Sequence, residues 1–243
     1  KYIKLTVRLA FLFLGVNISG HALVGEEMSM SSQVFPVDYM PCPDPLIEFE
    51  IWFKKAITSS ELEPTAMSLA TVDRKQRPMN RTVLYKGMVD KSLMFVTNYE
   101  SNKAQELELH PFAAVCFYWK SLELQVRVEG RVTKTSRSDS EKYFASRDRE
   151  SQIGAWVSSQ SRVLKSRKDL EAKKIEVEKR FAGKDVTCPP HWGGYKISPD
   201  VFEFWISGPG RLHNRFQYLL DKKQTIIVMV LFNKLTFLLN HAN

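Results

Sequence analysis

The sequence predicts an α+β protein built on an antiparallel β-barrel, with helices inserted between its strands. Segments with strand-like patterns recur from residue 66 to residue 220, and short helical segments separate them. The sequence contains no regular βαβ units and no internal repeat. Gly208 and Gly210 flank Pro209 without forming a G-x-G-x-x-G motif. These patterns disfavour a Rossmann domain.

The first helix is predicted to begin at Asp44, because aspartate is a favoured N-cap and Pro45 follows at the first helical position. Phe49 and Phe53 then recur at helical spacing. Further helices are predicted over residues 101–110, 138–147 and 166–181.

Strands are predicted where apolar and polar residues alternate. In residues 122–133, Val126 and Val128 alternate with Arg127 and Glu129, so one face of the strand is apolar and the other polar. The other predicted strands cover residues 66–72, 80–86, 92–97, 112–119, 194–197, 201–206 and 211–220.

Composition restricts the partners that this chain can have. A hydrophobic content of 44% is ample for a buried core, which argues against wholesale disorder. The formal net charge of +8 indicates an anionic partner, and nucleic acid, a membrane surface and a phosphorylated small molecule all fit it. The three cysteines form no C-x-x-C pair and the five histidines are scattered, so no metal site is predicted.

The two ends differ from the middle of the chain. Residues 1–22 carry three basic side chains ahead of an apolar run at residues 9–16, which is too short to span a bilayer but has a targeting peptide as one interpretation. We therefore expect an N-terminal extension over residues 1–43 that is flexible or targeting-like, a folded domain over residues 44–220 and an atypical apolar tail over residues 221–243. A cytoplasmic location is predicted, with targeting as the open alternative.

Potentially cationic side chains recur along the predicted strand over residues 211–220. With a two-residue period, Arg211, His213, Arg215 and Gln217 share one face. Such a row suits an anionic ligand, because the like charges otherwise repel one another. A solvated edge strand, whose charges deter aggregation, explains the row equally well.

A second cluster falls on the helix predicted from the capping-box pattern SDSE at residues 138–141. Tyr143 and Arg147 are four residues apart and share a face, and Ser151 follows one turn later if the helix continues. A guanidinium with two hydroxyls suits a phosphate group. An ordinary contact on a surface helix is the alternative.

A third group contains Arg81 and Lys86 on one predicted strand and Lys103 at the start of the next helix. Arg81 and Lys86 are five residues apart and would point to opposite faces of a regular strand. They require a bulge in the strand, or they serve different ends of a ligand. A helix N-terminus near Lys103 also attracts anions. Each of the three, taken singly, also suits a solvent-facing position.

Eight segments of the chain resemble the pyridoxine 5'-phosphate oxidase family, and they occur in the family's order across residues 44–218. They are NRTVLYKG (80–87), FVTNYES (95–101), QVRVEG (125–130), YFASR (143–147), SQIGAWVSSQS (151–161), WGG (192–194), EFW (203–205) and RLHNR (211–215).

The resemblance implies an FMN-binding split β-barrel, antiparallel and Greek-key-like with flanking helices, that forms a homodimer with FMN at the subunit interface. By the family pattern, the FMN-binding residues would be Arg81, Thr82, Val83, Leu84, Lys86, Val96, Thr97, Lys103, Gln125, Gln160, Ser161, Trp205 and Arg215. Those binding the substrate would be Lys86, Tyr143, Arg147 and Ser151 at its phosphate, with Arg211 and His213 over the pyridine ring as the catalytic pair.

The implied reaction oxidises pyridoxine 5'-phosphate or pyridoxamine 5'-phosphate to pyridoxal 5'-phosphate, a form of vitamin B6, while O2 is reduced to hydrogen peroxide. The positive charge is then explained without a nucleic-acid or membrane partner. A barrel that binds FMN or pyridoxal phosphate without efficient turnover is the alternative, and a basic nucleic-acid-binding module is a third interpretation that rests on charge alone.

The chain departs from the family pattern at several positions. Asn102 stands where a basic residue is expected, and Ile206 and Asn214 replace polar and acidic residues. The apolar, β-prone run at residues 225–232 replaces the usual C-terminal ending; it would form a substitute strand or expose an aggregation-prone segment. These departures motivate the non-catalytic alternative.

Overall fold

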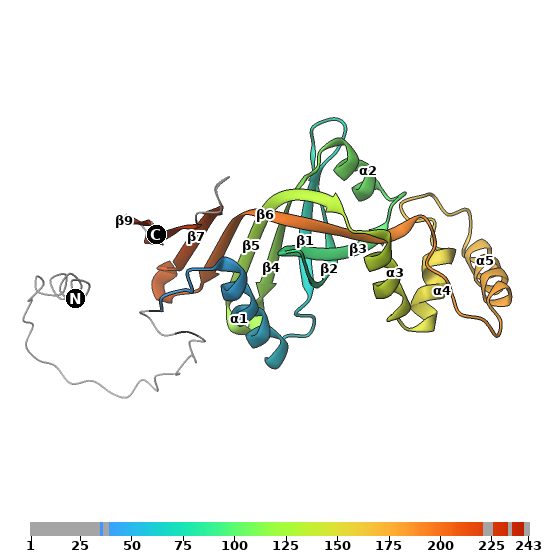
Figure 1. Cartoon of the computed structure of the whole chain (residues 1–243), viewed down its shortest axis with the longest axis horizontal. Helices are drawn as coiled ribbons and strands as arrows, with labels where there is room; N and C mark the ends of the chain where they lie inside the picture. The colour runs from blue at the N-terminus through green and yellow to red at the C-terminus, as the bar shows by residue number, and fades with distance from the viewer. Residues whose placement is uncertain (1–34, 36–38, 221–225, 233–234, 241–243) are drawn as a thin grey trace, which may run out of the picture. The chain divides into compact units, whose positions relative to one another are not determined.

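The structure is a computed structural model that describes residues 35, 39–220, 226–232 and 235–240 (Figure 1). The chain divides into two units, Lys1–Phe35 and Pro36–Asn243, and every described helix and strand lies in the second. The predicted extension therefore lies almost entirely outside the described residues.

Six antiparallel strands form a closed barrel. They follow the order β3-β2-β1-β4-β5-β6, and pairing of β3 with β6 closes the ring. The predicted α+β barrel with flanking helices is confirmed. The strands are β1 (Ala66–Val72), β2 (Pro78–Val89), β3 (Ser92–Asn98), β4 (Phe112–Trp119), β5 (Leu124–Lys134) and β6 (Trp192–Ile206).

The segment predicted as two short strands is one continuous strand, β6. Its pairing with β5 shifts register near Gly130, where Glu129 faces Val201 and Gly130 faces Pro199. The extra residue, Asp200, is accommodated as a bulge, so the proline bends the strand without ending it. A Cβ at Gly130 would lie 2.0 Å from the Ser198 carbonyl oxygen, which explains the glycine there.

Beyond this bulge the sheet leaves the barrel. The first part of β6 pairs with β3, whereas its second part pairs with β7 (Asn214–Leu220). Strands β8 (Ile226–Phe232) and β9 (Leu235–Asn240) continue the sheet from β7 in antiparallel pairing. The apolar C-terminal segment therefore forms strands, one of the two outcomes that the sequence left open.

Helix α1 (Pro45–Thr58) begins where the sequence predicts it. The Asp44 side chain accepts a hydrogen bond from the Leu46 amide at 2.8 Å. Phe49 is fully buried and packs against Tyr85 and Phe117 of the barrel, with ring centroids 5.4 and 5.3 Å away. The helix therefore closes one side of the barrel core (Figure 1).

Four further helices flank the barrel. Helix α2 follows β3, and the other three lie together around a second apolar cluster that includes Phe144, Ile153, Phe181 and Trp192 (Figure 1). None of the helices within the described residues is long and apolar enough to cross a membrane. Their bounds are α2 Asn102–Leu109, α3 Arg137–Ala145, α4 Arg149–Val157 and α5 Arg167–Arg180.

The helix predicted over residues 138–147 forms as α3 but ends before Arg147, and a separate helix follows. Ser136, rather than Ser138, caps α3 by accepting a hydrogen bond from the Asp139 amide at 3.0 Å. Helix α3 ends at Ala145, and Asp148 caps α4 by accepting from the Ser151 amide at 2.8 Å. Asp148 is a strong N-cap directly after the predicted helix, and it favours a new helix over continuation of the first.

Candidate functional site

A pocket of about 520 Å³ lies between the barrel and the α3–α4 junction. The barrel contributes strands β2 and β3 to its wall, and helix α2 and the loop after α4 complete it. Its lining residues are Thr82, Val83, Leu84, Lys86, Val96, Thr97, Lys103, Tyr143, Ser146, Arg147, Asp148, Ser151 and Gln160. All but Ser146 and Asp148 are residues that the family pattern assigned to cofactor or substrate.

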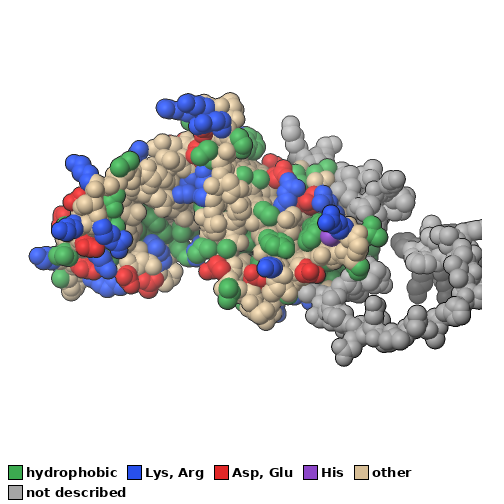
Figure 2. Space-filling model, turned by 180° about the vertical axis from the view of Figure 1, so that it is seen from behind, with side chains coloured by type: hydrophobic (Ala, Val, Ile, Leu, Met, Phe, Trp, Pro, Cys, Tyr) green, Lys and Arg blue, Asp and Glu red, His purple; other side chains and the backbone are tan. Residues whose placement is uncertain are grey.

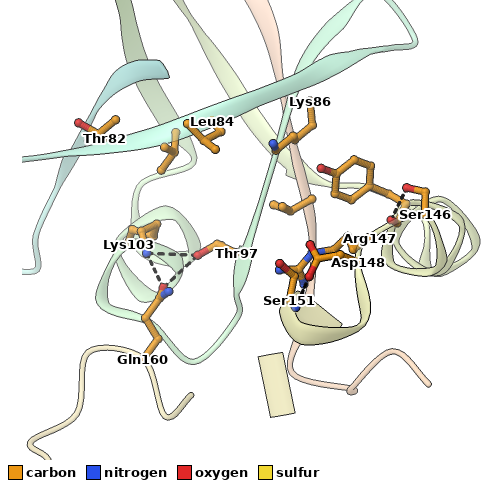
Figure 3. A pocket seen from close by; sticks show the side chains of 13 residues that line it. Thr82, Leu84, Lys86, Thr97, Lys103, Ser146, Arg147, Asp148, Ser151 and Gln160 are labelled. Atoms are coloured by element: carbon orange, nitrogen blue, oxygen red, sulfur yellow. Dashed lines mark hydrogen bonds between the residues drawn. The ribbon is translucent and has the colours of Figure 1, made fainter. Parts of the chain in front are cut away.

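One end of the pocket is built around the Lys103 ammonium group (Figure 3). Its Nζ donates to Gln160 Oε1 at 2.6 Å and to Thr97 Oγ1 at 3.2 Å. Burial lowers the pKa of Lys103, and the nearby positive charge of Arg81 lowers it further. The two partners that Lys103 reaches in the pocket are uncharged, so an anion entering at this end would gain a strong attraction.

The opposite end is built around Arg147, in the short break between α3 and α4. Its guanidinium carbon lies 4.8 Å from the centroid of the Trp192 ring, in a cation–π contact. Burial lowers the pKa of Arg147. Among the described residues, no group accepts a hydrogen bond from its buried Nη1. An unpaired buried donor is costly, and the contact with the Trp192 ring offsets part of that cost.

Lys86 lines the pocket from β2, across from Arg147 and Ser151 (Figure 3). Its Nζ is 6.0 Å from the centroid of the Tyr143 ring. The pairing of β2 with β3 shifts register between Tyr85 and Met88, where Gly87 has a φ of 94°. Lys86 thus lies within the irregular part of β2, which agrees with the bulge, one of the two alternatives that the sequence left open.

Arg81 and Ser161 are predicted cofactor residues that do not line the pocket. Arg81 forms an ion pair with Glu106 of α2, with Nη2 and Oε2 2.7 Å apart. Ser161 Oγ accepts a hydrogen bond from the Asn102 amide at 3.3 Å, beside Lys103 at the start of α2.

The other predicted residues do not line this pocket; they lie on strands β5, β6 and β7 and in the turn before β7. Trp205 faces Gln125 on one side and Arg215 on the other. The ring of His213 lies 4.6 Å from the Trp205 ring, between centroids. Arg211 is exposed and precedes His213 at the turn before β7. We call Gln125, Trp205, Arg211, His213 and Arg215 the strand group.

The prediction of one continuous strand over residues 211–220 is wrong at its start. A 3-10 turn, Pro209–Arg211, precedes β7, and Arg211 itself has a φ of 64°. Arg211 and His213 therefore lie before the strand, and of the predicted row only Arg215 and Gln217 lie on β7. The turn arises because Pro209 pre-sets its own φ and Gly210 adopts a positive φ of 61°.

Two acidic side chains near these groups were not identified from the sequence. Asp148 lines the pocket, and Glu203 is buried next to the strand group, 3.4 Å from Arg127 and 3.8 Å from Arg215. The N-cap preference of Asp148 is a signal that the sequence does contain. Glu203 has no local signal, because its partners lie on neighbouring strands. Within the part of the chain that the structure describes, no acidic, cysteine or histidine cluster suits a metal ion.

The closed barrel and its cationic pocket define a split β-barrel protein. A family profile described as pyridoxamine 5'-phosphate oxidase matches residues 53–181. A second profile, described as the pyridoxine 5'-phosphate oxidase C-terminal dimerisation region, matches residues 192–228. The chain belongs to the pyridoxamine 5'-phosphate oxidase family.

Sequence relatives support this assignment. The pyridoxine/pyridoxamine 5'-phosphate oxidase of Burkholderia thailandensis is 50% identical over 179 residues, which span 74% of this chain and 83% of the relative. The protein of the same name from Burkholderia mallei is 51% identical over the same length and the same shares of the two chains.

Solved structures share the fold. PhzG from Burkholderia lata, in complex with tetrahydrophenazine-1-carboxylic acid, has a TM-score of 0.75 and 26% identity, and the match covers 81% of this chain and 98% of PhzG. A pyridoxamine 5'-phosphate oxidase-related, FMN-binding protein from Nostoc punctiforme has a TM-score of 0.61 and 18% identity, covering 75% of this chain and 96% of that protein.

Proposed function

We propose that this chain is an FMN-dependent oxidase that converts pyridoxine 5'-phosphate or pyridoxamine 5'-phosphate to pyridoxal 5'-phosphate, with O2 reduced to hydrogen peroxide. The observation that carries the proposal is the pocket with a cation at each end, in a chain of this family. Lys103 and Arg147 offer separate sites for two phosphate groups, one from FMN and one from the substrate. Arg147 lines that end of the pocket, where its guanidinium would meet the substrate phosphate.

FMN is proposed to bind along β2 and β3, with its phosphate toward Lys103. On this side the pocket provides Thr82, Val83, Leu84, Lys86, Val96, Thr97, Lys103 and Gln160, and Arg81 and Ser161 lie near its Lys103 end. The redox chemistry comes from FMN, which when bound takes up a hydride equivalent from the substrate C4' carbon and is reoxidised by O2.

The substrate phosphate is proposed to bind Lys86, Tyr143, Arg147 and Ser151. The guanidinium offers paired donors that match phosphate oxygens, and the ammonium and hydroxyl groups can complete the oxygen shell. Contact of Arg147 with Trp192 limits the motion of its side chain before the ligand arrives. These residues hold the substrate in place, so that its C4' carbon can face the flavin.

The strand group is proposed to complete the site from a second copy of the chain. Trp205, Arg211, His213 and Arg215 fall within the segment that matches the family's dimerisation region. In a homodimer, Gln125, Trp205 and Arg215 would contact the FMN that the partner's pocket holds. Arg211 and His213 would lie over the pyridine ring and orient the C4' group, a role that requires neither to be a strong base.

The runner-up is a barrel that binds FMN or pyridoxal phosphate without efficient turnover. The amide of Asn102 donates to Ser161, and its neutral side chain stands beside Lys103 where the family pattern has a cation. The structural likeness to PhzG, which was solved with tetrahydrophenazine-1-carboxylic acid, is also compatible with a substrate other than a B6 phosphate.

The decisive test combines an absorbance spectrum with an oxidation assay of the purified protein. We expect a flavin spectrum, formation of pyridoxal 5'-phosphate from either substrate, and peroxide in equal amount. Flavin-loaded protein that turns over neither substrate would refute the oxidase and support the binding protein. Salt-sensitive binding to DNA or RNA, without flavin, would favour the nucleic-acid interpretation instead.

A further inference from the structure

Glu106 is a buried carboxylate one helical turn after Lys103 on α2. Only 6% of the residue is exposed. Its Oε2 accepts hydrogen bonds from Arg81 Nη2 at 2.7 Å and from Thr71 Oγ1 at 2.5 Å. A carboxylate is buried at this depth only when it is paired, and here both partners belong to strands of the barrel.

The ion pair fixes the Arg81 guanidinium beside the pocket. Arg81 directly precedes Thr82, the first residue of β2 that lines the pocket. Its Nη1 donates to Thr71 Oγ1 and, at 3.4 Å, to the Leu69 carbonyl oxygen. With Nη2 held by Glu106, the planar guanidinium has one defined orientation rather than several.

Glu106 also acts on Lys103 through its charge. Arg81 and Lys103 are close enough to interact electrostatically, and two cations at such separation repel each other. The positive charge of Arg81 lowers the pKa of Lys103, whereas the negative charge of Glu106 raises it. The carboxylate therefore favours the charged ammonium that this end of the pocket presents.

We propose that Glu106 is a positioning residue for the FMN phosphate, which orients Arg81 and offsets its repulsion of Lys103 so that both cations are in place before FMN binds. The inference rests on the proposed function, since it assumes that FMN occupies this end of the pocket. Glu106 itself would not touch the ligand. A purely structural ion pair would stabilise the fold without changing how FMN binding depends on pH.

The test measures FMN binding to the apoprotein by quenching of flavin fluorescence, from pH 7 to pH 10. The variants are Glu106→Gln, Glu106→Asp and, as a control on the same helix, Glu108→Gln. Glu108 pairs with Lys134 at 2.8 Å on the exposed side of α2. Circular dichroism and thermal unfolding show whether each variant is folded.

We expect Glu106→Gln to weaken FMN binding about tenfold at pH 7. The substitution removes the charge-assisted hydrogen bond that orients Arg81 toward the FMN phosphate. Its affinity should also decline at a lower pH than that of the unsubstituted chain, since Lys103 loses its proton more easily. Glu106→Asp keeps the charge, so it should lose less affinity and retain the original pH profile. Glu108→Gln should match the unsubstituted chain in both measurements.

Two results would overturn the inference while leaving the proposed function intact. The first is a folded Glu106→Gln that binds FMN as tightly, and with the same pH profile, as the unsubstituted chain. If that variant does not fold, the second is a Glu106→Asp whose pH profile moves although its charge is kept. Failure of the unsubstituted chain to bind FMN at all would instead overturn the proposed function, and this inference with it.

Discussion

At the scale of single residues, the pocket depends on two partly buried cations, Lys103 and Arg147. Arg147 is partly buried against aromatic rings, and its Nη1 has no acceptor among the described residues. Lys103 is partly buried against neutral oxygens. Partial burial of a cation lowers the stability of the fold, and an anionic ligand bound beside it would offset this loss.

Replacing Arg147 tests the substrate end of the pocket. For Arg147→Ala we expect KM for pyridoxine 5'-phosphate to rise roughly 10- to 100-fold, because charge-assisted hydrogen bonds to phosphate are lost. FMN content should stay near that of the unsubstituted protein. Lys142→Ala, at an exposed position on α3, is the control. An unchanged KM, or loss of flavin instead, would contradict the assignment of Arg147.

The strand group allows a second comparison between neighbouring residues. Arg211→Ala or His213→Ala should lower turnover more than FMN retention, because these side chains are assigned to the pyridine ring. Arg215→Ala should lower FMN retention, because Arg215 is assigned to the flavin. Steady-state rates and flavin content per chain measure the two effects. Loss of flavin in Arg211→Ala or His213→Ala, with flavin retained but turnover lost in Arg215→Ala, would contradict these assignments.

At the scale of elements, the break between α3 and α4 is what brings Ser146, Arg147 and Asp148 to the pocket. Asp148 has two effects there. Its carboxylate caps α4, and the hydrogen bonds from Ser151 lower the pKa of Asp148. The capping contribution is therefore present at neutral pH and is lost as the pH falls through this lowered pKa. The same carboxylate adds a negative charge to a pocket proposed to bind phosphate.

Two substitutions at Asp148 separate these effects. Asp148→Asn keeps a side chain that caps a helix but removes the charge, so we expect the affinity for substrate phosphate to rise about two- to fivefold at low salt. Asp148→Ala removes both, so its thermal stability should fall below that of Asp148→Asn. Equal stability of the two variants would contradict the capping role, and weaker phosphate affinity in Asp148→Asn would contradict the charge effect.

Local patterns predicted these elements only in part. Helix α1 and strand β5 follow their sequence patterns, because an Asp-Pro start and a two-residue alternation act within a few neighbouring residues. The helix predicted over residues 138–147 forms but ends at Ala145, because Asp148 caps a new helix directly after it. The continuous β6 also escaped prediction, because the partner strands β3, β5 and β7 support it across Pro199.

At the scale of the whole molecule, basic side chains of the described residues are distributed among acidic ones on the face opposite to that of Figure 1 (Figure 2). The predicted site residues instead form two groups, the pocket and the strand group. Since all members of the strand group except Gln125 fall in the family's dimerisation region, we propose that each site takes its pocket from one copy and its strand group from the other.

Mixing two impaired variants tests this shared site. At pyridoxine 5'-phosphate concentrations far below KM, Arg147→Ala and His213→Ala are each expected to have little activity as homodimers. After unfolding and refolding together, half of the dimers would be mixed, and each mixed dimer would contain one intact site. Activity should therefore recover to about a quarter of the unsubstituted value. No recovery, with mixed dimers verified by mass, would show that each site is built within one chain.

The sequence by itself determined the barrel class, the start of the first helix and the family, because capping, alternation and ordered motifs are carried by residues close together in the chain. Only the tertiary structure decided which predicted residues share a pocket, where the helix breaks beside Arg147, and that Glu106 holds Arg81. These features depend on strand pairing and on contacts between segments distant in sequence. Contacts between distant segments leave no signature in a local sequence pattern, so only the folded chain shows them.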